Sequence, residues 1–400
     1  MTGVVVIGAG QAGASLVAKL RSEGYDGPIT LIGEEPVPPY QRPPLSKKYL
    51  LGDMALERLY LRPESYYAEA GIDLRLGLRV TAIDRAAQEV VIGTERLGYA
   101  HLVLATGSRP RHLPAAIGGE LGGVHVVRTL ADVDAMAPGF VPGARVLIVG
   151  GGYIGLEAAA VAASRGMQVV LVEMAPRILQ RVAAKETSDY FRALHGRHGV
   201  DIREGVGLER LLGDGQVSGA HLTDGTEVAV DMVIVGVGIV PDTALAEAVG
   251  LAIDNGIAVD AQGRTSDPTI WAVGDCASFP HGEGRLRLES VPNAIDMADC
   301  VAGNILGAAV AYVPKPWFWS DQYDVKLQIA GLSTGYDRIV TRDGAASVSF
   351  WYFRGDQLLA VDAMNDPRAY MVGKRLIDAG KTADPAVVAD AAADLKVLLG

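Results

Sequence analysis

Cysteine is scarce in this chain, which has only Cys276 and Cys300 among 400 residues. Two cysteines cannot build a disulfide framework, and their spacing matches no metal-ligand pattern. No uncharged apolar stretch approaches the roughly 20 residues that a membrane-spanning helix needs. The apolar N-terminus also lacks the basic region of a signal peptide. We therefore expect no metal site, no membrane association and a cytoplasmic location.

Basic residues are in deficit, with 36 lysines and arginines against 47 acidic residues and a formal net charge of -11. This charge argues against nucleic acid or an anionic membrane as a general partner, although it permits a local basic patch. A hydrophobic content of 49% is ample for large cores. The length suggests roughly two or three domains.

Glycine, by contrast, is abundant and forms the same phosphate-binding motif twice. VVVIGAGQAG covers residues 4–13 and RVLIVGGGYIG covers residues 145–155. Each motif follows a β-branched run typical of a buried parallel strand and opens an alanine-rich segment typical of a helix. The first glycine permits a tight turn, the second lets backbone approach a diphosphate, and the third lets helix pack on strand. These positions are Gly8, Gly10 and Gly13 in the first motif, and Gly150, Gly152 and Gly155 in the second.

A carboxylate follows each motif at the end of the next expected strand. Glu34 comes after PITLIG and Glu173 after MQVVLV, where each can accept from a ribose hydroxyl. The two motifs therefore predict two dinucleotides, a flavin that stays bound and a nicotinamide that visits. In TIWAVGDCA, Asp275 ends a strand and is a candidate to bond the ribityl chain of FAD.

Further strings make the family recognisable: PPYQRPPLSK (38–47), LVLATGSRP, GGGYIGLE, TSDPTIWAVGDCA, ESVPNAID and PWFWSDQYD. Over nearly its whole length the chain resembles the FAD-dependent, NADH-oxidising ferredoxin reductases that feed bacterial oxygenases. The resemblance implies that hydride passes from NADH onto FAD and that single electrons pass to a 2Fe-2S ferredoxin. The oxygenase component would then be an indirect partner.

The expected fold is α/β, with two Rossmann-like dinucleotide-binding domains as in glutathione reductase and a small α+β C-terminal domain. Residues 1–109 and 239–316 are predicted to form a discontinuous FAD-binding domain. Residues 110–238 are predicted to form the NAD-binding domain. From residue 317 to residue 400, short strands, a hairpin at Arg354-Gly355 and a helical tail predict the C-terminal ferredoxin-reductase-type domain.

One absence bears on the mechanism. Disulfide reductases of this architecture carry a redox-active cysteine pair shortly after the first phosphate loop, whereas this chain reads YQRPPLSKKYL there. Electrons must therefore leave from the flavin itself. Flavin accepts two electrons together and can release them singly, which suits an iron-sulfur acceptor.

The resemblance also implies roles for individual residues. Lys47 is expected near flavin N5, paired with Glu157, although a merely structural pair is an alternative. Tyr153 resembles an aromatic gate over the flavin, unless it only packs at the helix start. Trp319 is the candidate path to ferredoxin, unless it is a core residue. The resemblance adds Ala12, Arg42, Val80, Arg128 and Val291 as FAD contacts, with plain surface charge as the alternative for Arg42 and Lys47. Ile154 and Gly238 are further cofactor-binding candidates. Glu289 is a candidate to contact the carboxamide of nicotinamide, unless it is a surface acid.

Some residues carry a plainer interpretation. Trp317 and Trp319 would share one face of a strand, with Phe318 on the other. His195 and His198 are interpreted as solvated. Cys276 is expected to be a small buried residue. Candidate docking charges in the C-terminal domain are Lys326, Arg338, Arg342, Lys374 and Arg375.

Two alternative functions remain open. The first is a reductase of rubredoxin or of a small organic radical on the same fold. The second is a redox-gated interaction protein similar to apoptosis-inducing factor, which the lack of a targeting segment, a basic bias or a long C-terminal insertion disfavours.

Overall fold

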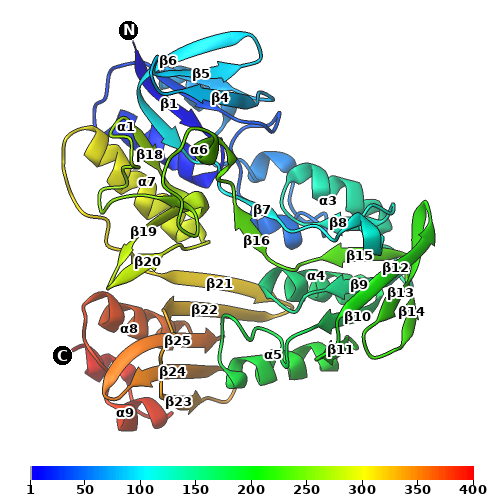
Figure 1. The fold of residues 1–400 in the computed structure, drawn as a ribbon. Helices are drawn as coiled ribbons and strands as arrows, with labels where there is room; N and C mark the ends of the chain where they lie inside the picture. The colour runs from blue at the N-terminus through cyan, green and yellow to red at the C-terminus, as the bar shows by residue number, and fades with distance from the viewer. Residues whose placement is uncertain (1) are drawn as a thin grey trace. The chain divides into compact units, whose positions relative to one another are not determined.

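A computed structural model of the chain describes residues 2–400 (Figure 1). These residues form two compact units. Unit 1 comprises residues 2–41, 55–109 and 239–316, and unit 2 comprises residues 42–54, 110–238 and 317–400. The division of the chain into three domains stays a prediction. No helix within residues 2–400 has the length and hydropathy of a membrane span.

Unit 1 is built on a seven-stranded sheet in the order β3-β2-β1-β6-β5-β4, with β18 beside β6. The strands β1, β2, β3, β6 and β18 pair in parallel, and β4 and β5 continue the sheet as an antiparallel extension of β6. The bounds are β1 (Gly3–Ile7), β2 (Ile29–Ile32), β3 (Ile72–Arg75), β4 (Val80–Asp84), β5 (Glu89–Ile92), β6 (Glu95–Leu104) and β18 (Ile270–Ala272).

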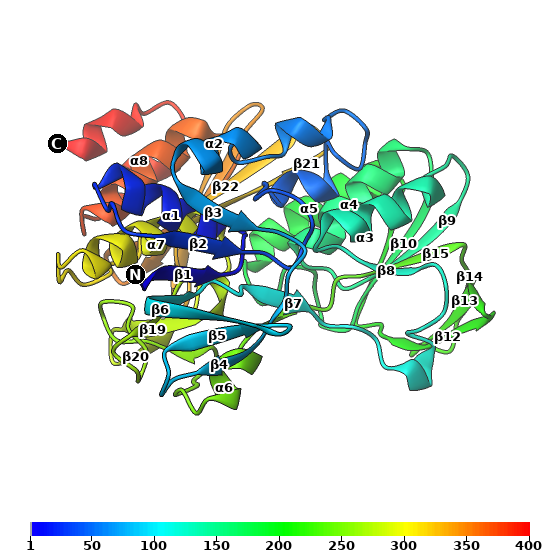
Figure 2. The same ribbon diagram turned by 90° about the horizontal axis from the view of Figure 1, so that it is seen from above.

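Two helices pack against each other beside these parallel strands (Figure 2). α1 (Gln11–Ser22) starts at the first glycine motif and buries Leu16, Val17 and Leu20. α7 (Val291–Ile305) begins with Ser290 as its N-cap, whose side chain accepts from the Asn293 backbone. An N-cap of this type satisfies a backbone donor that would otherwise be orphaned.

The rest of unit 1 consists of short elements around this core. The strand β16 pairs with β7, and β17, β19 and β20 form a small sheet. The bounds are η2 (Leu56–Arg58), α2 (Glu64–Glu69), β7 (Ser108–Pro110), β16 (Ile239–Pro241), α6 (Ala244–Ala248), β17 (Ile257–Ala258), η5 (Gly274–Cys276), β19 (Ala277–His281) and β20 (Gly284–Leu286).

Unit 2 contains a second parallel sheet, in the order β11-β10-β9-β15-β8. Its glycine motif joins β9 to α4, as the first motif joins β1 to α1. The bounds are β8 (Val124–Val126), α3 (Leu130–Met136), β9 (Arg145–Val149), α4 (Tyr153–Ser164), β10 (Gln168–Glu173), α5 (Lys185–Arg197), β11 (Asp201–Glu204) and β15 (Met232–Val235).

The C-terminal part of unit 2 is an antiparallel sheet, in the order β21-β22-β25-β24-β23, with α8 packed against it (Figure 1). The hairpin turn lies at Gly355 and Asp356, because Arg354 still pairs with Gln357. The expected turn at Arg354-Gly355 was therefore one residue early. The bounds are β21 (Trp317–Gln322), β22 (Val325–Gly331), β23 (Arg338–Asp343), β24 (Val348–Arg354), β25 (Gln357–Met364) and α8 (Pro367–Asp378).

The remaining elements of unit 2 are short. The strands β12, β13 and β14 form an antiparallel sheet, and α9 and η6 end the chain. The bounds are η1 (Pro43–Ser46), η3 (Ala115–Ile117), η4 (Ala137–Gly139), β12 (Leu208–Asp214), β13 (Gln216–Leu222), β14 (Glu227–Ala229), α9 (Pro385–Ala389) and η6 (Leu395–Leu399).

Candidate functional site

The first glycine of each motif has no room for a side chain. Gly8 adopts a φ of +112°, and a Cβ on it would lie 2.1 Å from the carbonyl oxygen of Ala105. Gly150 adopts +108°, and its Cβ would lie 2.4 Å from the carbonyl oxygen of Gly236. Both loops therefore turn tightly over the neighbouring strand, which only glycine permits.

The middle glycine of each motif faces open space. A Cβ added to Gly10 or to Gly152 would meet no atom within 4 Å, and each residue is the N-cap of its helix. No side chain caps either helix, so backbone N–H groups point into the opening. A helix N-terminus of this kind binds a diphosphate. The two loops therefore fit two dinucleotides, one in each unit.

Glu173 lies beside the second loop. Its Oε2 accepts from the backbone N–H of Gly151 at 2.7 Å, and its Oε1 accepts from that of Ala175 at 2.7 Å. Arg177 is held elsewhere, because it donates to the Ser188 hydroxyl at 2.5 Å and to a backbone carbonyl. The charge next to this loop is therefore negative.

In unit 1, the counterpart Glu34 is exposed and pairs with Arg79 at 3.2 Å. Asp275 accepts from the Ser108 hydroxyl at 3.0 Å. The backbone of Gly274 approaches Ala12 so closely that a Cβ there would lie 3.0 Å from the Ala12 methyl group. The loop after β18 and the start of α1 therefore lie together.

Arg287 is a residue of this region that the sequence patterns do not reveal. It is largely buried, donates to the carbonyl oxygen of Asp275 at 3.1 Å and pairs with Glu289 at 2.7 Å. Its Nε is buried without a partner. Glu289 is thus held by an arginine that also fixes the Asp275 backbone.

Lys47 and Glu157 lie together in unit 2. The Lys47 ammonium is 2.9 Å from Glu157 Oε1, and the two side chains are only 14% and 7% exposed. Ser46 donates to Glu157 Oε2 at 2.8 Å, and Ser320 donates to Oε1 at 2.6 Å. Burial raises the pKa of Glu157, while Lys47 and the two hydroxyls oppose that rise. The expected pair is present, and three donors surround its carboxylate.

Strand and helix periodicities align the residues around this pair. On α4, Tyr153 and Glu157 are four residues apart and share one face, and on β21 the side chains alternate. The Tyr153 ring packs on Phe318 at 4.8 Å between centroids, and Glu157 meets Ser320. The Tyr153 hydroxyl is buried without a partner. Burial raises its pKa well above the ordinary value, so the hydroxyl stays protonated.

On the other face of β21 the rings of Trp317 and Trp319 stack with 5.4 Å between their centroids, as the spacing predicts.

The remaining predicted cofactor contacts lie in varied settings. Arg42 lies immediately before η1 and donates to the carbonyl oxygen of Arg128 at 2.6 Å. Val80 packs in the core of unit 1, so any ligand contact there would come from its backbone. Val291 is the first residue of α7, Ile154 is 41% exposed, and Gly238 has a φ of +98°.

The interpretation of His195 as solvated was wrong. His195 is fully buried, because it falls four residues after Phe191 on the apolar stripe of α5, whereas His198 is exposed. Its Nε2 lies 2.8 Å from Gln322 Oε1. Burial lowers the pKa of His195 to about 4, so the ring is neutral. Cys276 is fully buried, as expected.

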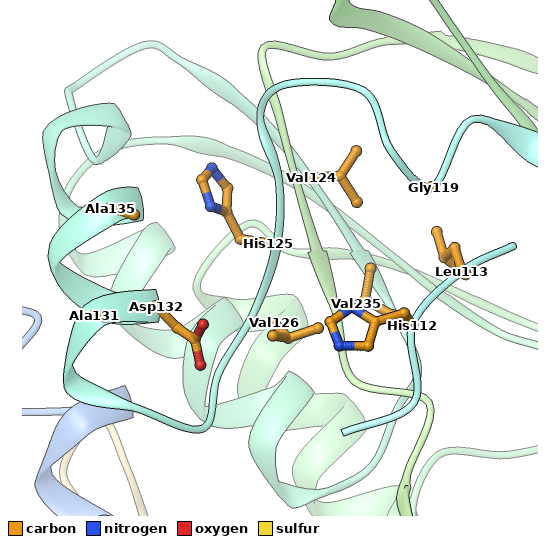
Figure 3. Close-up of a pocket in the computed structure, with 10 residues that line it drawn as sticks. All are labelled: His112, Leu113, Gly119, Val124, His125, Val126, Ala131, Asp132, Ala135 and Val235. Carbon is orange, nitrogen blue, oxygen red and sulfur yellow. The ribbon is translucent and has the colours of Figure 1, made fainter. Parts of the chain in front are cut away.

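A cavity of about 250 Å³ in unit 2 is lined by residues of β8, α3 and the end of β15, among others (Figure 3). Its polar groups include His112, His125 and Asp132. The Asp132 carboxylate accepts from the Thr129 backbone in the capping box of α3. No group of three metal-ligating side chains occurs in the part of the chain that the structure describes, residues 2–400. None of the residues that line the cavity is a predicted cofactor contact.

The chain matches two known families along its length. Residues 2–298 match the pyridine nucleotide-disulphide oxidoreductase family, and residues 317–399 match the reductase C-terminal family. The chain belongs to the pyridine nucleotide-disulphide oxidoreductases. Within this family it has no cysteine in the segment 40–50, and both of its cysteines are free.

Its relatives are similar over almost their full length. Rhodocoxin reductase from Rhodococcus erythropolis is 42% identical, over 99% of this chain and 94% of the relative. A ferredoxin–NAD(P)(+) reductase from Sphingomonas sp. is 44% identical, over 96% of this chain and 94% of the relative. The structure of a covalent putidaredoxin reductase–putidaredoxin complex superimposes with a TM-score of 0.95 at 41% identity, covering 100% of this chain and 98% of that one.

Proposed function

We propose that this chain is an FAD-dependent NADH:ferredoxin reductase that serves an oxygenase. The observation that carries the proposal is the pair of matching loops, each with an open middle glycine at a helix N-terminus. The full-length similarity to reductases named for rhodocoxin and ferredoxin supports the choice of acceptor.

The chain offers residues to hold both cofactors. In unit 1 the loop around Gly10 would bind the FAD diphosphate, Glu34 the adenosine ribose and Asp275 the ribityl chain. In unit 2 the loop around Gly152 would bind the NADH diphosphate, with Glu173 accepting from the adenosine ribose. When bound, FAD accepts two electrons together from NADH and releases them singly to an iron-sulfur protein.

The Lys47–Glu157 pair is proposed to act at the flavin. Glu157 holds the Lys47 ammonium in one orientation at 2.9 Å. A preorganised ammonium in a largely buried place stabilises negative charge more strongly than one in water. No dithiol can form in segment 40–50, so the route through a disulfide that the family name describes is closed. Electrons would leave directly from FAD.

Tyr153 and Trp319 are assigned separate roles. Tyr153 begins α4, and its packing on Phe318 gives a ring that can cover the flavin until the nicotinamide displaces it. Trp319 is half-buried and stacks on Trp317, which fits a path for electrons toward a docked protein. We place the enzyme in the cytoplasm, where its two free cysteines would stay reduced.

The docking surface is proposed to use basic side chains of the C-terminal part. Lys326, Arg338 and Arg375 are exposed. Arg342 is not available, because its guanidinium donates to carbonyl oxygens of the C-terminal tail, including those of Asp390 and Ala393. Exposed basic residues would steer an acidic ferredoxin.

The test is steady-state turnover of the FAD-loaded enzyme with NADH and a panel of acceptors. We expect rapid reduction of at least one 2Fe-2S ferredoxin, followed by cytochrome c as the final acceptor. Rubredoxin and a small organic radical are the comparison substrates. Faster turnover with either of these than with every ferredoxin would overturn the assignment of the acceptor.

A further inference from the structure

A line of buried hydrogen bonds in unit 2 connects Glu157 to His195. Ser320 Oγ lies 2.6 Å from Glu157 Oε1, and Gln322 Nε2 lies 3.1 Å from Ser320 Oγ. The Oε1 of Gln322 lies 2.8 Å from His195 Nε2. The Tyr323 hydroxyl, 3.2 Å from His195 Nδ1, is the outer end of the line.

Chemistry fixes the direction of every bond in this line. Glu157 as a carboxylate only accepts, so Ser320 must give it the hydroxyl proton and is left with lone pairs. Gln322 must then offer its amide nitrogen to Ser320 and turn its oxygen to His195. His195 therefore carries its proton on Nε2, and its Nδ1 accepts from Tyr323. All the donors point toward Glu157.

Water has little access to this line. Ser320, Gln322 and His195 are fully buried, and Glu157 is 5% exposed. The three elements involved are separate in the chain, because α4 supplies Glu157, β21 supplies Ser320 and Gln322, and α5 supplies His195. A buried polar group that loses its partner has no water to replace it. Removal of any one of these side chains would therefore deprive its neighbour of a hydrogen-bond partner.

We propose that Ser320, Gln322 and His195 are positioning residues that hold Glu157 as an oriented carboxylate for Lys47. This inference rests on the proposed function, in which the Lys47–Glu157 pair acts at the flavin. Burial by itself favours the neutral carboxyl of Glu157. The Ser320 hydroxyl, which the bonds behind it polarise, opposes this effect because it donates to the carboxylate.

Other titratable groups act on the two ends of the line. Lys47 faces Glu157 from the segment after η1, and Tyr153 faces it from α4 itself. His198 acts on His195 from the end of α5, and its ring stacks on Tyr323 at 3.7 Å. A shift in Glu157 titration has to be separated from changes in these neighbours.

The first test titrates Glu157 in the FAD-loaded enzyme by infrared spectroscopy, with Glu157→Gln as the reference for its carboxyl band. Ser320→Ala should raise the midpoint of Glu157 protonation by about one pH unit, a tenfold change in proton affinity. Ser320→Thr, which keeps the hydroxyl, should restore the midpoint. An unchanged midpoint in Ser320→Ala would overturn the proposal.

Ser349→Ala is the matched control for this test. Ser349 is also fully buried in the same sheet, accepts from the Trp351 indole at 3.1 Å and donates to the Asp366 carboxylate at 3.1 Å. It has no bond to Glu157, so its removal should leave the Glu157 midpoint in place. An equal shift in Ser349→Ala would show a general loss of packing and overturn the proposal.

A second test needs no variant and does not depend on activity. In ¹⁵N-histidine NMR spectra of the enzyme, His195 should show a proton on Nε2 and stay neutral from pH 8 to pH 5. A proton on Nδ1, or titration near the ordinary value, would contradict the line. These spectra test only the hydrogen bonds between Glu157 and His195. Ferredoxin turnover of the unmutated enzyme tests the proposed function, so the two failures can be told apart.

Discussion

The Lys47 ammonium lies 2.9 Å from Glu157 Oε1, and neither side chain is more than 14% exposed. Both residues belong to unit 2, although one precedes the second glycine motif and the other follows it. Lys47 lies in segment 40–50, where disulfide reductases of this architecture carry cysteines. Because the Lys47–Glu157 pair is largely buried, each of its charges exerts a stronger electrostatic effect than it would at the surface.

Lys47→Met should slow reduction of the flavin by NADH by roughly 10²-fold, as expected on losing one preorganised charge. FAD should stay bound, because the predicted diphosphate and ribose contacts lie elsewhere. Stopped-flow bleaching of the flavin absorbance measures the rate. The exposed neighbour Lys48 provides the control, since Lys48→Met should react at the unmutated rate. An unaltered rate in Lys47→Met would remove the pair from the mechanism.

Coenzyme choice should depend on Glu173. Its carboxylate beside the second loop would repel a 2′-phosphate, and Arg177 is held by Ser188 and backbone. We expect a strong preference for NADH, reduced by at least about tenfold in Glu173→Ala and further in Glu173→Arg. The measurement is kcat/KM with each coenzyme. Equal efficiency with NADPH in the unmutated enzyme would contradict this role.

Acceptor docking should separate from flavin reduction. Trp319→Ala should lower ferredoxin reduction by about 30-fold, the effect of losing an interface anchor worth about 2 kcal/mol. Reduction of ferricyanide by NADH, which needs no docking surface, should persist. Parallel loss of both activities would instead indicate that Trp319 serves flavin binding or folding.

Charge reversal at Lys326, Arg338 or Arg375 should weaken ferredoxin reduction, and added salt should do the same in the unmutated enzyme. The matched comparison is Arg342→Glu, which should lower thermal stability because it releases the C-terminal tail. A ferredoxin rate that is insensitive to salt would argue against a basic docking patch.

Stability should depend on pH through His195. Because its folded pKa is about 4 against 6.5 unfolded, the folded protein binds fewer protons between these values. Stability is therefore lost as pH falls from about 6.5, by about 2 kcal/mol at pH 5. The measurement is the free energy of unfolding in urea, as a function of pH. The unmutated enzyme should show the loss that comes from His195, and His195→Gln should not.

Asp362 acts in the opposite direction, since burial raises its pKa to about 6. Because the folded protein then binds more protons than the unfolded chain, its ionisation removes stability as pH rises from about 3.8 to about 6. The Asp362 contribution is the same in the unmutated enzyme and in His195→Gln. It therefore cancels when the unfolding free energies of the two proteins are subtracted. A difference in unfolding free energy that stays constant from pH 7 to pH 5 would contradict the burial of a neutral His195.

Local patterns were enough to predict the two loops. A glycine turn between a strand and a helix is a short-range feature, and the open space at Gly10 and Gly152 follows from it. The stacking of Trp317 and Trp319 also follows from strand alternation. The Lys47–Glu157 pair came from family resemblance, because nothing in either segment alone brings them together.

The line from Glu157 to His195 could not be predicted in the same way. His195 lies at helical spacing from Phe191, a signal that indicates burial but does not identify the partner. That partner, Gln322, comes from a strand far along the chain. Arg342 was misjudged for a related reason, since a charged residue in a strand gives no sign that a later tail supplies its acceptors.

The measurement that tests the central claim most directly is an anaerobic titration of the FAD-loaded enzyme with NADH in the presence of an oxidised 2Fe-2S ferredoxin. Because each NADH carries two electrons and each ferredoxin accepts one, we predict two ferredoxins reduced per NADH, in rapid steps that follow flavin bleaching. Flavin that is bleached by NADH but does not pass its electrons to any ferredoxin tested would contradict the account.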